Sequence, residues 1–271
     1  MRTIGLLFCF LTGALAQAPR FFIQMSDPQF GMYAKDRNFI QETANFEFFV
    51  ANANRLKPMF VVACGDLVNR AGDADQIAEY KRISRKLDRN IPIYNVPGNH
   101  DVGNDPTPES VALYRKNMGP DYYTFKAGDI TGIVLDSSLI KAPGKAPDEA
   151  RKQEEWLTDE LRKAAAGRVI VFQHHPYFLE KPDEPDQYFN IPAETRARYL
   201  ELFHKFGVKY VFAGHYHRNA FGRDGDLEMI TTGPVGMPIG PDPSGFRIVL
   251  VKPDKLDQQY YGLGTIPNTI E

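Results

Sequence analysis

The sequence has 271 residues, of which 43% are hydrophobic and 12% are aromatic, and its formal net charge is -2. This hydrophobic content is ample for one large core, and single α/β domains of this length are ordinary. A nearly balanced charge argues against nucleic acid or an anionic membrane as the main partner.

The N-terminal residues have the pattern of a secretory signal peptide. Arg2 gives a short basic start, residues 4–11 are apolar, and Ala14-Leu15-Ala16 is a small-x-small cleavage site. The apolar run is too short to anchor the chain across a bilayer. The alternative is a buried first strand. We expect a signal peptide at residues 1–16 and an exported protein, secreted or periplasmic, whose single domain covers residues 17–271.

Cleavage at this site would leave one cysteine in the mature chain. Cys9 lies within the predicted signal peptide, and Cys64 ends an apolar run. A single thiol cannot form an internal disulfide. This agrees with an exported protein whose core is large enough to be stable without one.

Taken in chain order, the apolar patterns predict alternating strands and helices. The expected strands are apolar runs at residues 21–25, 59–64, 91–96, 122–125, 130–135, 169–173 and 208–212. The expected helices, with apolar residues three or four positions apart, are residues 36–56, 76–87, 107–119, 148–166 and 192–206. Loops are expected at residues 140–147 and 180–190, and strands separated by turns at 221–261. We therefore predict a single α/β domain.

Polar residues stand where five of these strands end. They are Asp27 and Gln29, Asp66 and Asn69, Asn99 with His100 and Asp101, His174 and His175, and His215 and His217. The first three groups are 39 and 33 residues apart (27 to 66 to 99), which is the length of a βαβ unit. Such units place the carboxyl ends of parallel strands together, and ligands bind at that edge. We therefore expect the five groups to meet.

Each group alone has an ordinary structural explanation. Asp27 precedes a proline and suits a turn, whereas Asp66 follows a glycine and suits a turn or a helix cap. Asn99 after Gly98 suits a left-handed turn, and the histidine pair at 174–175 suits a solvated strand edge. Five such groups, all at strand ends, favour a metal site instead.

The residue types indicate which chemistry this site would perform. Carboxylate and amide oxygens beside imidazoles suit borderline-to-hard ions such as Mn, Fe, Zn or Mg. A carboxylate can reach two cations with its two oxygens. Two cations about 3.5–4 Å apart clamp the attacking and the departing oxygen of a displacement at phosphorus. The pattern therefore favours hydrolysis of a phosphoric ester.

The order of these motifs resembles the calcineurin-like metallophosphoesterases. The family's Asp-x-(His), Gly-Asp, Gly-Asn-His-Asp/Glu, His and Gly-His-x-His motifs match in order between residue 20 and about residue 250. The resemblance implies a four-layer α/β/β/α sandwich and two divalent metal ions. It implies that Asp66 bridges the two metals, that Asp27, Gln29 and His217 complete the first site, and that Asn99, His174 and His215 complete the second.

Some matches point to one branch of the family, whose animal members are described as serine/threonine-protein phosphatases. Residues 27–31, 98–103, 172–176 and 214–219 are similar to that branch. Those animal proteins are intracellular, so the predicted signal peptide is a departure from them.

Gln29 is a second departure, because most members of the family have histidine there. An amide oxygen is a weaker and harder donor than an imidazole nitrogen. We therefore expect looser binding at the first site and a preference for Mn, Mg or Fe over Zn.

The reaction implied by the resemblance is direct attack on phosphorus by a metal-bound hydroxide, without a phospho-enzyme. His100, next to the predicted ligand Asn99, is the candidate general acid for the leaving alkoxide. Asp101 is the candidate residue that orients this imidazole. The alternative for Asp101 is a carboxylate that caps the turn.

Spacing alone does not decide which histidine of the pair is the ligand. Alternation along an extended chain sends His174 and His175 in opposite directions. The resemblance favours His174, which leaves His175 near the substrate or behind the ligands. Three further residues that follow predicted ligands, Asn69, Arg70 and Arg218, are candidate substrate contacts, with ordinary surface positions as the alternative.

Three functions fit this pattern. The first is a phosphomonoesterase that acts on phosphoserine, phosphothreonine or a small phosphate ester, so that its partner is a phosphoprotein or a phosphorylated small molecule. The second is a phosphodiesterase or nucleotide pyrophosphatase, which uses the same metals. The third is a catalytically weak metal-bearing protein that binds a partner through the acidic loop 180–190. The complete ligand set favours an enzyme, and its specificity depends on loops such as 102–107, 139–148 and 180–191.

Overall fold

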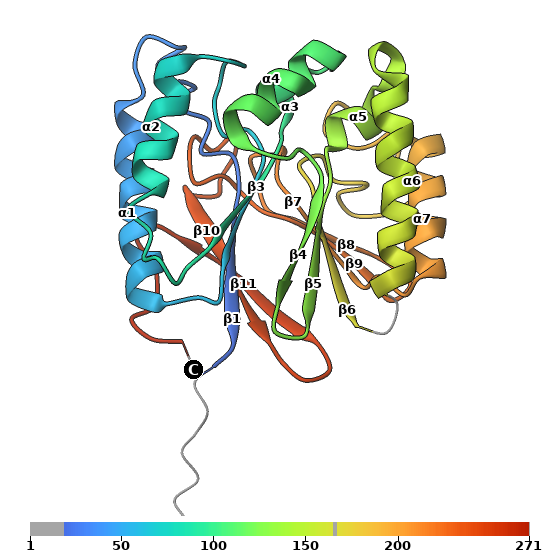
Figure 1. The fold of residues 1–271 in the computed structure, drawn as a ribbon. Coiled ribbons are helices and arrows are strands. Elements are labelled where there is room, and N and C mark those ends of the chain that lie inside the picture. Colours follow the sequence, from blue (N-terminus) through green and yellow to red (C-terminus); the bar gives the residue numbers. More distant parts are fainter. Residues whose placement is uncertain (1–18, 165–166, 271) are drawn as a thin grey trace, which may run out of the picture.

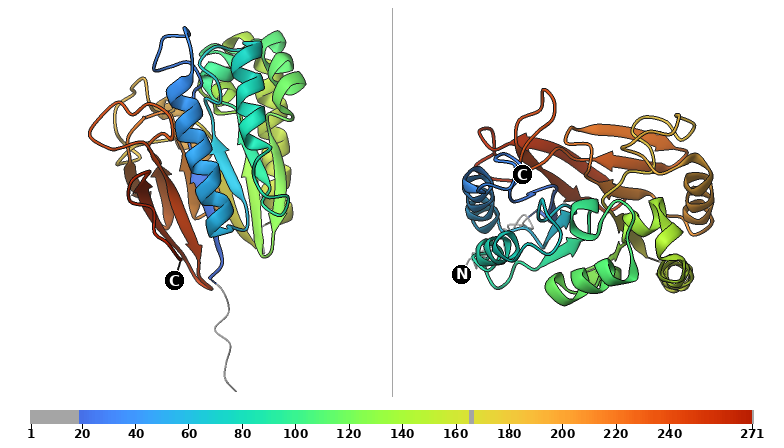
Figure 2. Two further views of the ribbon diagram at one scale, coloured as in Figure 1. Left: turned by 90° about the vertical axis from the view of Figure 1, so that its left-hand side faces the viewer. Right: turned by 90° about the horizontal axis from the view of Figure 1, so that it is seen from above.

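The computed structural model of the protein describes residues 19–164 and 167–270, which form two sheets flanked by helices (Figure 1). The predicted signal peptide, residues 1–16, lies outside the described residues. Figure 2 shows the two sheets stacked face to face between two pairs of helices. This is the expected four-layer α/β/β/α sandwich in a single domain.

The first sheet contains the strands that carry the N-terminal half of the site. Its order is β11-β10-β1-β2-β3. These strands are β1 (Phe21–Met25), β2 (Val61–Cys64), β3 (Ile93–Val96), β10 (Gly245–Val251) and β11 (Leu256–Gly262). Strands β1, β2 and β3 are parallel, as the βαβ spacing predicts, and β10 pairs antiparallel with β1.

The second sheet carries the C-terminal half of the site. Its order is β4-β5-β6-β7-β9-β8. These strands are β4 (Tyr123–Ala127), β5 (Ile130–Val134), β6 (Arg168–Phe172), β7 (Tyr210–Ala213), β8 (Ala220–Asp224) and β9 (Leu227–Thr231). Strands β5, β6, β7 and β9 are parallel, and the two edge strands run antiparallel to their neighbours.

Helices cover the outer face of each sheet. Helices α1 (Ile40–Leu56) and α2 (Ala74–Ser84) pack on the first sheet, and α6 (Pro147–Ala164) and α7 (Ala193–Lys205) pack on the second. The remaining helices are α3 (Asn99–Val102), α4 (Pro108–Met118) and α5 (Ser137–Lys141). None of the helices in the described residues is long and apolar enough to cross a membrane.

Strand β1 shows why the layers form. Its side chains alternate, so that Ile23 packs against the α1 side while Phe22 faces the second sheet. The Phe22 ring lies 5.9 Å from Phe172 and 5.6 Å from Phe212, which belong to β6 and β7. Burying an aromatic ring stabilises the fold by about 1.5–3 kcal/mol. This packed inner layer fixes the relative positions of the strand ends that carry the site.

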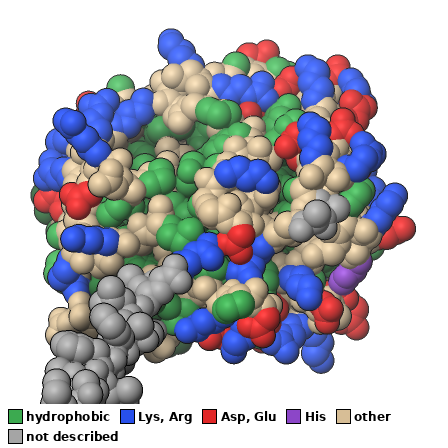
Figure 3. Space-filling view, turned by 60° about the horizontal axis from the view of Figure 1, so that its bottom comes forward, with side chains coloured by type: hydrophobic (Ala, Val, Ile, Leu, Met, Phe, Trp, Pro, Cys, Tyr) green, Lys and Arg blue, Asp and Glu red, His purple; other side chains and the backbone are tan. Residues whose placement is uncertain are grey.

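The end of the sandwich away from α3 has an ordinary charged surface. Figure 3 shows basic and acidic side chains interspersed there around apolar patches. This distribution agrees with the small net charge of the sequence.

Two local predictions are corrected by the structure. Residues 140–147 are not wholly a loop, because α5 reaches Lys141 and a short 3-10 helix covers Pro143–Lys145. The Asp136 carboxylate starts α5 by accepting hydrogen bonds from the N–H groups of Ser138 (2.9 Å) and Leu139 (3.3 Å). The stretch after β3 is not an isolated turn but the short helix α3.

Candidate metal centre

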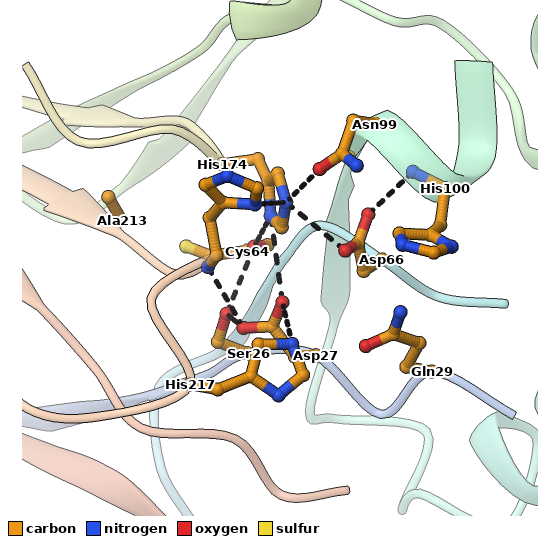
Figure 4. Close-up of polar contacts among 12 residues, drawn as sticks. Ser26, Asp27, Gln29, Cys64, Asp66, Asn99, His100, His174, Ala213 and His217 are labelled. Carbon is orange, nitrogen blue, oxygen red and sulfur yellow. Dashed lines mark hydrogen bonds and ion pairs between the residues drawn. The ribbon is translucent and has the colours of Figure 1, made fainter. Parts of the chain in front are cut away.

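The predicted ligands meet at the carboxyl ends of β1, β2, β3, β6 and β7. Figure 4 shows how side chains from both sheets point toward one another there. The seven predicted ligands, Asp27, Gln29, Asp66, Asn99, His174, His215 and His217, are all buried. His100 lies beside them and is half-buried. The convergence expected from the sequence is therefore confirmed.

The backbone is strained at most of these ligands. Five of the seven have a positive φ angle: Asp27 (50°), Gln29 (38°), Asp66 (50°), His215 (67°) and His217 (53°). A side chain other than glycine in this region costs of order 1–3 kcal/mol, and such strain gathers at functional sites. The strand ends are bound together, since Asp27 N donates to Gly65 O (3.1 Å) and Gln29 N donates to Asp66 O (2.8 Å). These bonds hold the strained residues in place.

Backbone carbonyls determine the tautomer of each predicted histidine ligand. His174 Nδ1 lies 2.9 Å from Cys64 O, and His217 Nδ1 lies 2.6 Å from Met237 O. His215 uses its other nitrogen, with Nε2 lying 3.3 Å from Tyr188 O. A carbonyl can only accept a hydrogen bond, so each of these nitrogens carries the proton. The remaining nitrogen of each ring is therefore the one that can bind a metal cation or a further proton.

These free nitrogens point at oxygens and at one another. His174 Nε2 lies 3.0 Å from Asn99 Oδ1, 3.1 Å from His215 Nδ1 and 3.3 Å from Asp66 Oδ2. His217 Nε2 lies 3.4 Å from Asp27 Oδ1. Lone pairs that face each other across such distances need positive charge between them. This geometry fits metal cations.

Two buried oxygens support the same conclusion. Asp27 Oδ1 and Gln29 Oε1 have no hydrogen-bond partner among the described residues. Gln29 uses its amide N–H instead, donating to Asn69 Oδ1 at 3.2 Å, which leaves its oxygen free toward the site. A buried polar atom without a partner is costly, and a metal ligand would account for both oxygens.

The donors form two groups with Asp66 between them. Donor atoms of Asp27, Asp66 and His217 lie within 4.8 Å of one another, as do those of His174, His175 and His215. Asp66 belongs to the first group and also approaches His174 of the second. Its position therefore fits the predicted bridging role between two cations.

The charge distribution of the site favours a cation. Burial opposes ionisation of Asp66, but the neighbouring imidazoles, His174 first, outweigh burial and hold the pKa of this carboxyl well below its usual range. Burial also opposes protonation of His174, but Asp66 raises the pKa of this imidazole to about 9. The Asp66 carboxylate therefore stabilises positive charge at His174 despite burial.

Gly98 is required at the start of α3 for space rather than for its φ angle. Its φ is -113°, which any residue can adopt. A Cβ atom at this position would lie 2.2 Å from both the backbone nitrogen and Oδ1 of Asp66. The absent side chain lets His100 N donate to Asp66 Oδ1 at 2.8 Å, which orients the predicted bridging carboxylate.

His175 lies beside His174 and His215, but one of its ring nitrogens is occupied by Ser137. Its Nδ1 lies 3.0 Å from Ser137 Oγ, and this oxygen accepts hydrogen bonds from the backbone N–H groups of His174 (3.2 Å) and His175 (2.8 Å). Burial lowers the pKa of His175 well below its usual range, so its ring is neutral. The geometry favours His174 as the ligand and His175 as a support. Ser137 is not among the residues expected from the sequence, because a serine just beyond the predicted strand 130–135 gives no signal of this role.

The prediction that Asp101 orients His100 is wrong. Asp101 accepts hydrogen bonds from the backbone N–H groups of Gly98 (2.8 Å), Leu67 (3.0 Å) and Val68 (3.2 Å). The alternative, a capping carboxylate, describes it correctly, because Asp101 joins α3 to the loop that carries Asp66. His100 is oriented by a main-chain group, since its Nδ1 donates to Asn69 O at 2.7 Å.

The three candidate substrate contacts have different surroundings. The Asn69 side chain supports Gln29 and also donates to Asp36 Oδ1 at 2.8 Å. Arg70 is exposed and pairs with Asp73, so the structure shows the surface pair that was the alternative. Arg218 is half-buried, and its guanidinium lies 5.0 Å over the Tyr216 ring.

Comparisons with known proteins agree with this geometry. Residues 22–219 match the model of the family described as calcineurin-like phosphoesterase. The human "Serine/threonine-protein phosphatase CPPED1" is 38% identical over 266 residues, which cover 91% of this chain and 85% of the human protein. A "Probable cyclic nucleotide phosphodiesterase" of Fibrobacter succinogenes is 27% identical over 239 residues, covering 85% of each chain.

A solved structure, a dimetal phosphatase from Danio rerio, has the same fold. It superposes with a TM-score of 0.65 at 18% identity, covering 91% of this chain and 97% of that one. The donor geometry and the relatives together show a metal-dependent phosphoesterase, a hydrolase of phosphoric esters that uses two divalent metal ions. The chain belongs to the calcineurin-like phosphoesterase family.

Proposed function

We propose that this enzyme is a phosphomonoesterase that acts on phosphoserine or phosphothreonine. One observation carries the proposal, namely the position of His100. Its half-buried ring follows the predicted ligand Asn99, and Nδ1 is fixed by Asn69 O, while Nε2 has no partner among the described residues. The alkoxide of serine or threonine is a poor leaving group that needs a proton, and this nitrogen is placed to supply one.

The predicted ligands form two sets, one for each metal cation. Asp27, Gln29, Asp66 and His217 would hold the first cation, and Asn99, His174 and His215, with Asp66 shared, would hold the second. When bound, the cations would neutralise phosphoryl oxygens and lower the pKa of an attacking water. His100 would transfer its Nε2 proton to the oxygen of the leaving serine or threonine. Asn69 O keeps this ring in the orientation that the transfer needs.

The relatives also support this substrate class. The human relative at 38% identity is named a serine/threonine-protein phosphatase, and the relative named a phosphodiesterase is less similar, at 27%. The second candidate is therefore a phosphodiesterase, which would use the same metals with a larger leaving group.

The experiment that tests the proposal is a substrate panel measured with Mn, Fe, Zn and Mg in turn. It contains p-nitrophenyl phosphate, its bis-ester, and matched peptides that carry phosphoserine, phosphothreonine or phosphotyrosine. We expect the monoester to be hydrolysed faster than the bis-ester, and both aliphatic phosphopeptides to be hydrolysed. Faster hydrolysis of the bis-ester would favour the phosphodiesterase instead.

We further propose that the protein is exported. The support is the sequence pattern of residues 1–16, with a basic start, an apolar stretch and a small-x-small site near Ala16. Mass spectrometry of the mature N-terminus should find a chain that starts near Gln17. A mature protein that still carries residues 1–16 would contradict export by this route.

A further inference from the structure

Aromatic side chains border the second group of predicted ligands. The Tyr188 ring lies 5.0 Å from the His215 ring and 5.4 Å from Phe189. Phe189 packs edge-on against Tyr216, 4.9 Å between centroids, and the Arg218 guanidinium lies 5.0 Å over the Tyr216 ring. We call these four residues, Tyr188, Phe189, Tyr216 and Arg218, the aromatic arc. The arc is continuous and begins against a predicted metal ligand.

Lys141 fixes the end of the arc that touches the ligand. Its ammonium donates to the carbonyl oxygens of Tyr188 (2.9 Å), Gln187 (3.5 Å) and Asn190. Tyr188 O is the same oxygen that accepts from His215 Nε2 at 3.3 Å. The loop that presents Tyr188 is therefore tied both to α5 and to the ligand.

The rest of this loop is held by buried and half-buried polar groups. Glu184 accepts hydrogen bonds from the backbone N–H groups of Leu179 (2.9 Å) and Glu180 (3.0 Å) and from the Asn190 side chain (2.7 Å). Arg196 is fully buried and donates to Glu184 O at 2.9 Å. A surface carried on such a loop is preformed, so a ligand that binds to it loses little free energy in ordering it.

The arc exposes apolar surface next to the metal centre. The Tyr188 residue is 57% exposed. Ile239, 43% exposed, adjoins the other end, because Arg218 Nε donates to its carbonyl and Ile239 N donates to His217 O at 3.2 Å. Exposed apolar surface that continues a catalytic site indicates a binding surface.

An open groove adjoins the aromatic arc at Tyr216. Its volume is about 720 Å³, and its lining includes Tyr216, Gln187 and Phe221, the last of which is 45% exposed. Binding sites for small organic ligands have similar volumes, about 300–1,000 Å³. The groove therefore gives the arc room for more than one residue of a substrate.

The angles between the rings favour a peptide over a nucleobase. Tyr188 and Phe189 meet at 79°, and Phe189 and Tyr216 meet at 77°, so neighbouring rings of the arc do not form a parallel slot for a flat base. Rings at steep angles offer both edges and faces, which suit irregular aliphatic side chains.

Arg218 adds a charge preference at the far end of the arc. Its guanidinium has no carboxylate partner among the described residues and donates only to Ile239 O and, at 3.4 Å, to the Tyr216 hydroxyl. Guanidinium groups bind carboxylates through paired donors. An acidic side chain of a substrate would supply the missing partner.

We infer that the aromatic arc is a substrate subsite for protein phosphatase activity. It would bind a peptide segment beside the phosphoserine that carries an apolar residue and then an acidic one. This inference rests on the proposed function, because it names the part of a phosphoprotein that this enzyme recognises outside the phosphoryl group.

The test compares three phosphoserine peptides, which carry beside the phosphoserine either leucine and glutamate, leucine and lysine, or glycine at both positions. We expect kcat/KM to be about tenfold higher for the first peptide than for the glycine peptide, mainly through a lower KM. Tyr188→Ala should remove most of this preference. Arg218→Glu should reverse the preference for an acidic residue, so that the lysine peptide is hydrolysed with a higher kcat/KM than the glutamate peptide. Phe48→Ala, at a 48% exposed aromatic residue on α1, is the matched control and should retain the preference.

Hydrolysis of p-nitrophenyl phosphate and metal content are measured on every variant. A variant that keeps both but loses peptide preference supports the subsite. Equal kcat/KM for all phosphoserine peptides in the unmodified enzyme would overturn the subsite and leave the proposed function intact. Hydrolysis of p-nitrophenyl phosphate without hydrolysis of any phosphoserine peptide would overturn the proposed function, and the subsite with it.

Discussion

The Nε2 atom of His174 lies 3.1 Å from the Nδ1 atom of His215, and both nitrogens direct lone pairs into the same space. Each ring has already given its N–H group to a backbone carbonyl, that of Cys64 or that of Tyr188. Two such lone pairs repel each other unless positive charge lies between them, supplied by a metal cation or, without one, by a proton on His174. The hydrogen bonds of the protein alone therefore prepare a cation site.

The role of His100 predicts a dependence on the leaving group. His100→Ala should lower kcat for a phosphoserine peptide by roughly 10²–10⁴-fold, the usual range for loss of a general acid. The same variant should lose much less activity with p-nitrophenyl phosphate, because p-nitrophenolate leaves without a proton. Steady-state rates with both substrates provide the measurement.

A control for this experiment is His204→Ala. His204 is on α7 and pairs with Asp224 at 2.7 Å. Its loss should leave both rates unchanged. Equal losses of activity with the two substrates in His100→Ala would contradict the assignment of His100 as the proton donor.

Exchanging Gln29 for histidine should strengthen the first metal site. Loss of an outer partner of a ligand changes metal affinity by about 10–100-fold, so a change of the donor atom itself should lower Kd by at least about tenfold. The exchange should also shift the preference from Mn toward Zn, because imidazole is the softer donor. Calorimetric titrations of Gln29→His with Mn and with Zn would measure both effects. If neither Kd nor the order of metals changes, the weak-donor account of Gln29 fails.

Gly98→Ala should disrupt the metal centre by steric crowding alone. Its Cβ would lie 2.2 Å from Asp66 Oδ1, and crowding of this kind costs about 1–3 kcal/mol. We expect lower metal occupancy together with lower stability in urea unfolding. Gly144→Ala is the matched control, because a Cβ there meets nothing within 4 Å. Unchanged metal content in Gly98→Ala would show that the close approach to Asp66 is not needed.

The raised pKa of Asp136 predicts how the free energy of unfolding depends on pH. Burial, with a further contribution from Asp121, raises the pKa of Asp136 to about 7, above its usual value near 3.8. Between these values the folded state binds more protons than the unfolded state, so this residue makes stability fall as pH rises, by at most about 1.4 kcal/mol per pH unit. Its contribution is fully present below pH 3.8 and is lost as pH passes 7.

Asp136→Asn isolates this effect. The amide keeps an oxygen for the N–H groups that begin α5 but does not ionise. We expect the free energy of unfolding of the variant, relative to the unmodified protein, to increase between pH 5 and pH 7.5. Parallel stability curves for the two proteins over this range would contradict the assigned pKa.

The fold and the convergence of the candidate ligands could be predicted because both depend on local signals in the sequence. Apolar runs buried on both faces identify β2 and β6. Parallel strands place Asp27, Asp66 and Asn99 at one edge of the first sheet and His174 and His215 at one edge of the second, and the face-to-face packing of the sheets brings the two edges together. The length between the first three polar groups was sufficient to indicate βαβ connections. The position of a strand end does not depend on the direction of its side chains.

The supporting contacts could not be predicted, because they depend on side-chain direction and on main-chain groups. Asp101 points back at three backbone N–H groups only because α3 turns it toward the loop after β2. The histidine tautomers are fixed by main-chain carbonyl oxygens such as Tyr188 O. Because every residue type has a main-chain carbonyl, the sequence does not indicate which one will accept the hydrogen bond. Lys141, which holds that carbonyl, was placed in an expected loop.

The account is tested most directly by metal counting and hydrolysis on Asp66→Ala. The unmodified protein, stripped with a chelator and titrated with Mn, should bind two equivalents and regain hydrolysis of p-nitrophenyl phosphate. Asp66→Ala, which removes the carboxylate between the two donor groups, should bind at most one equivalent. Its kcat should fall by roughly 10²–10³-fold, as expected when a group that stabilises the transition state is lost. Two bound equivalents with unchanged hydrolysis in Asp66→Ala would contradict a dinuclear centre built around this residue.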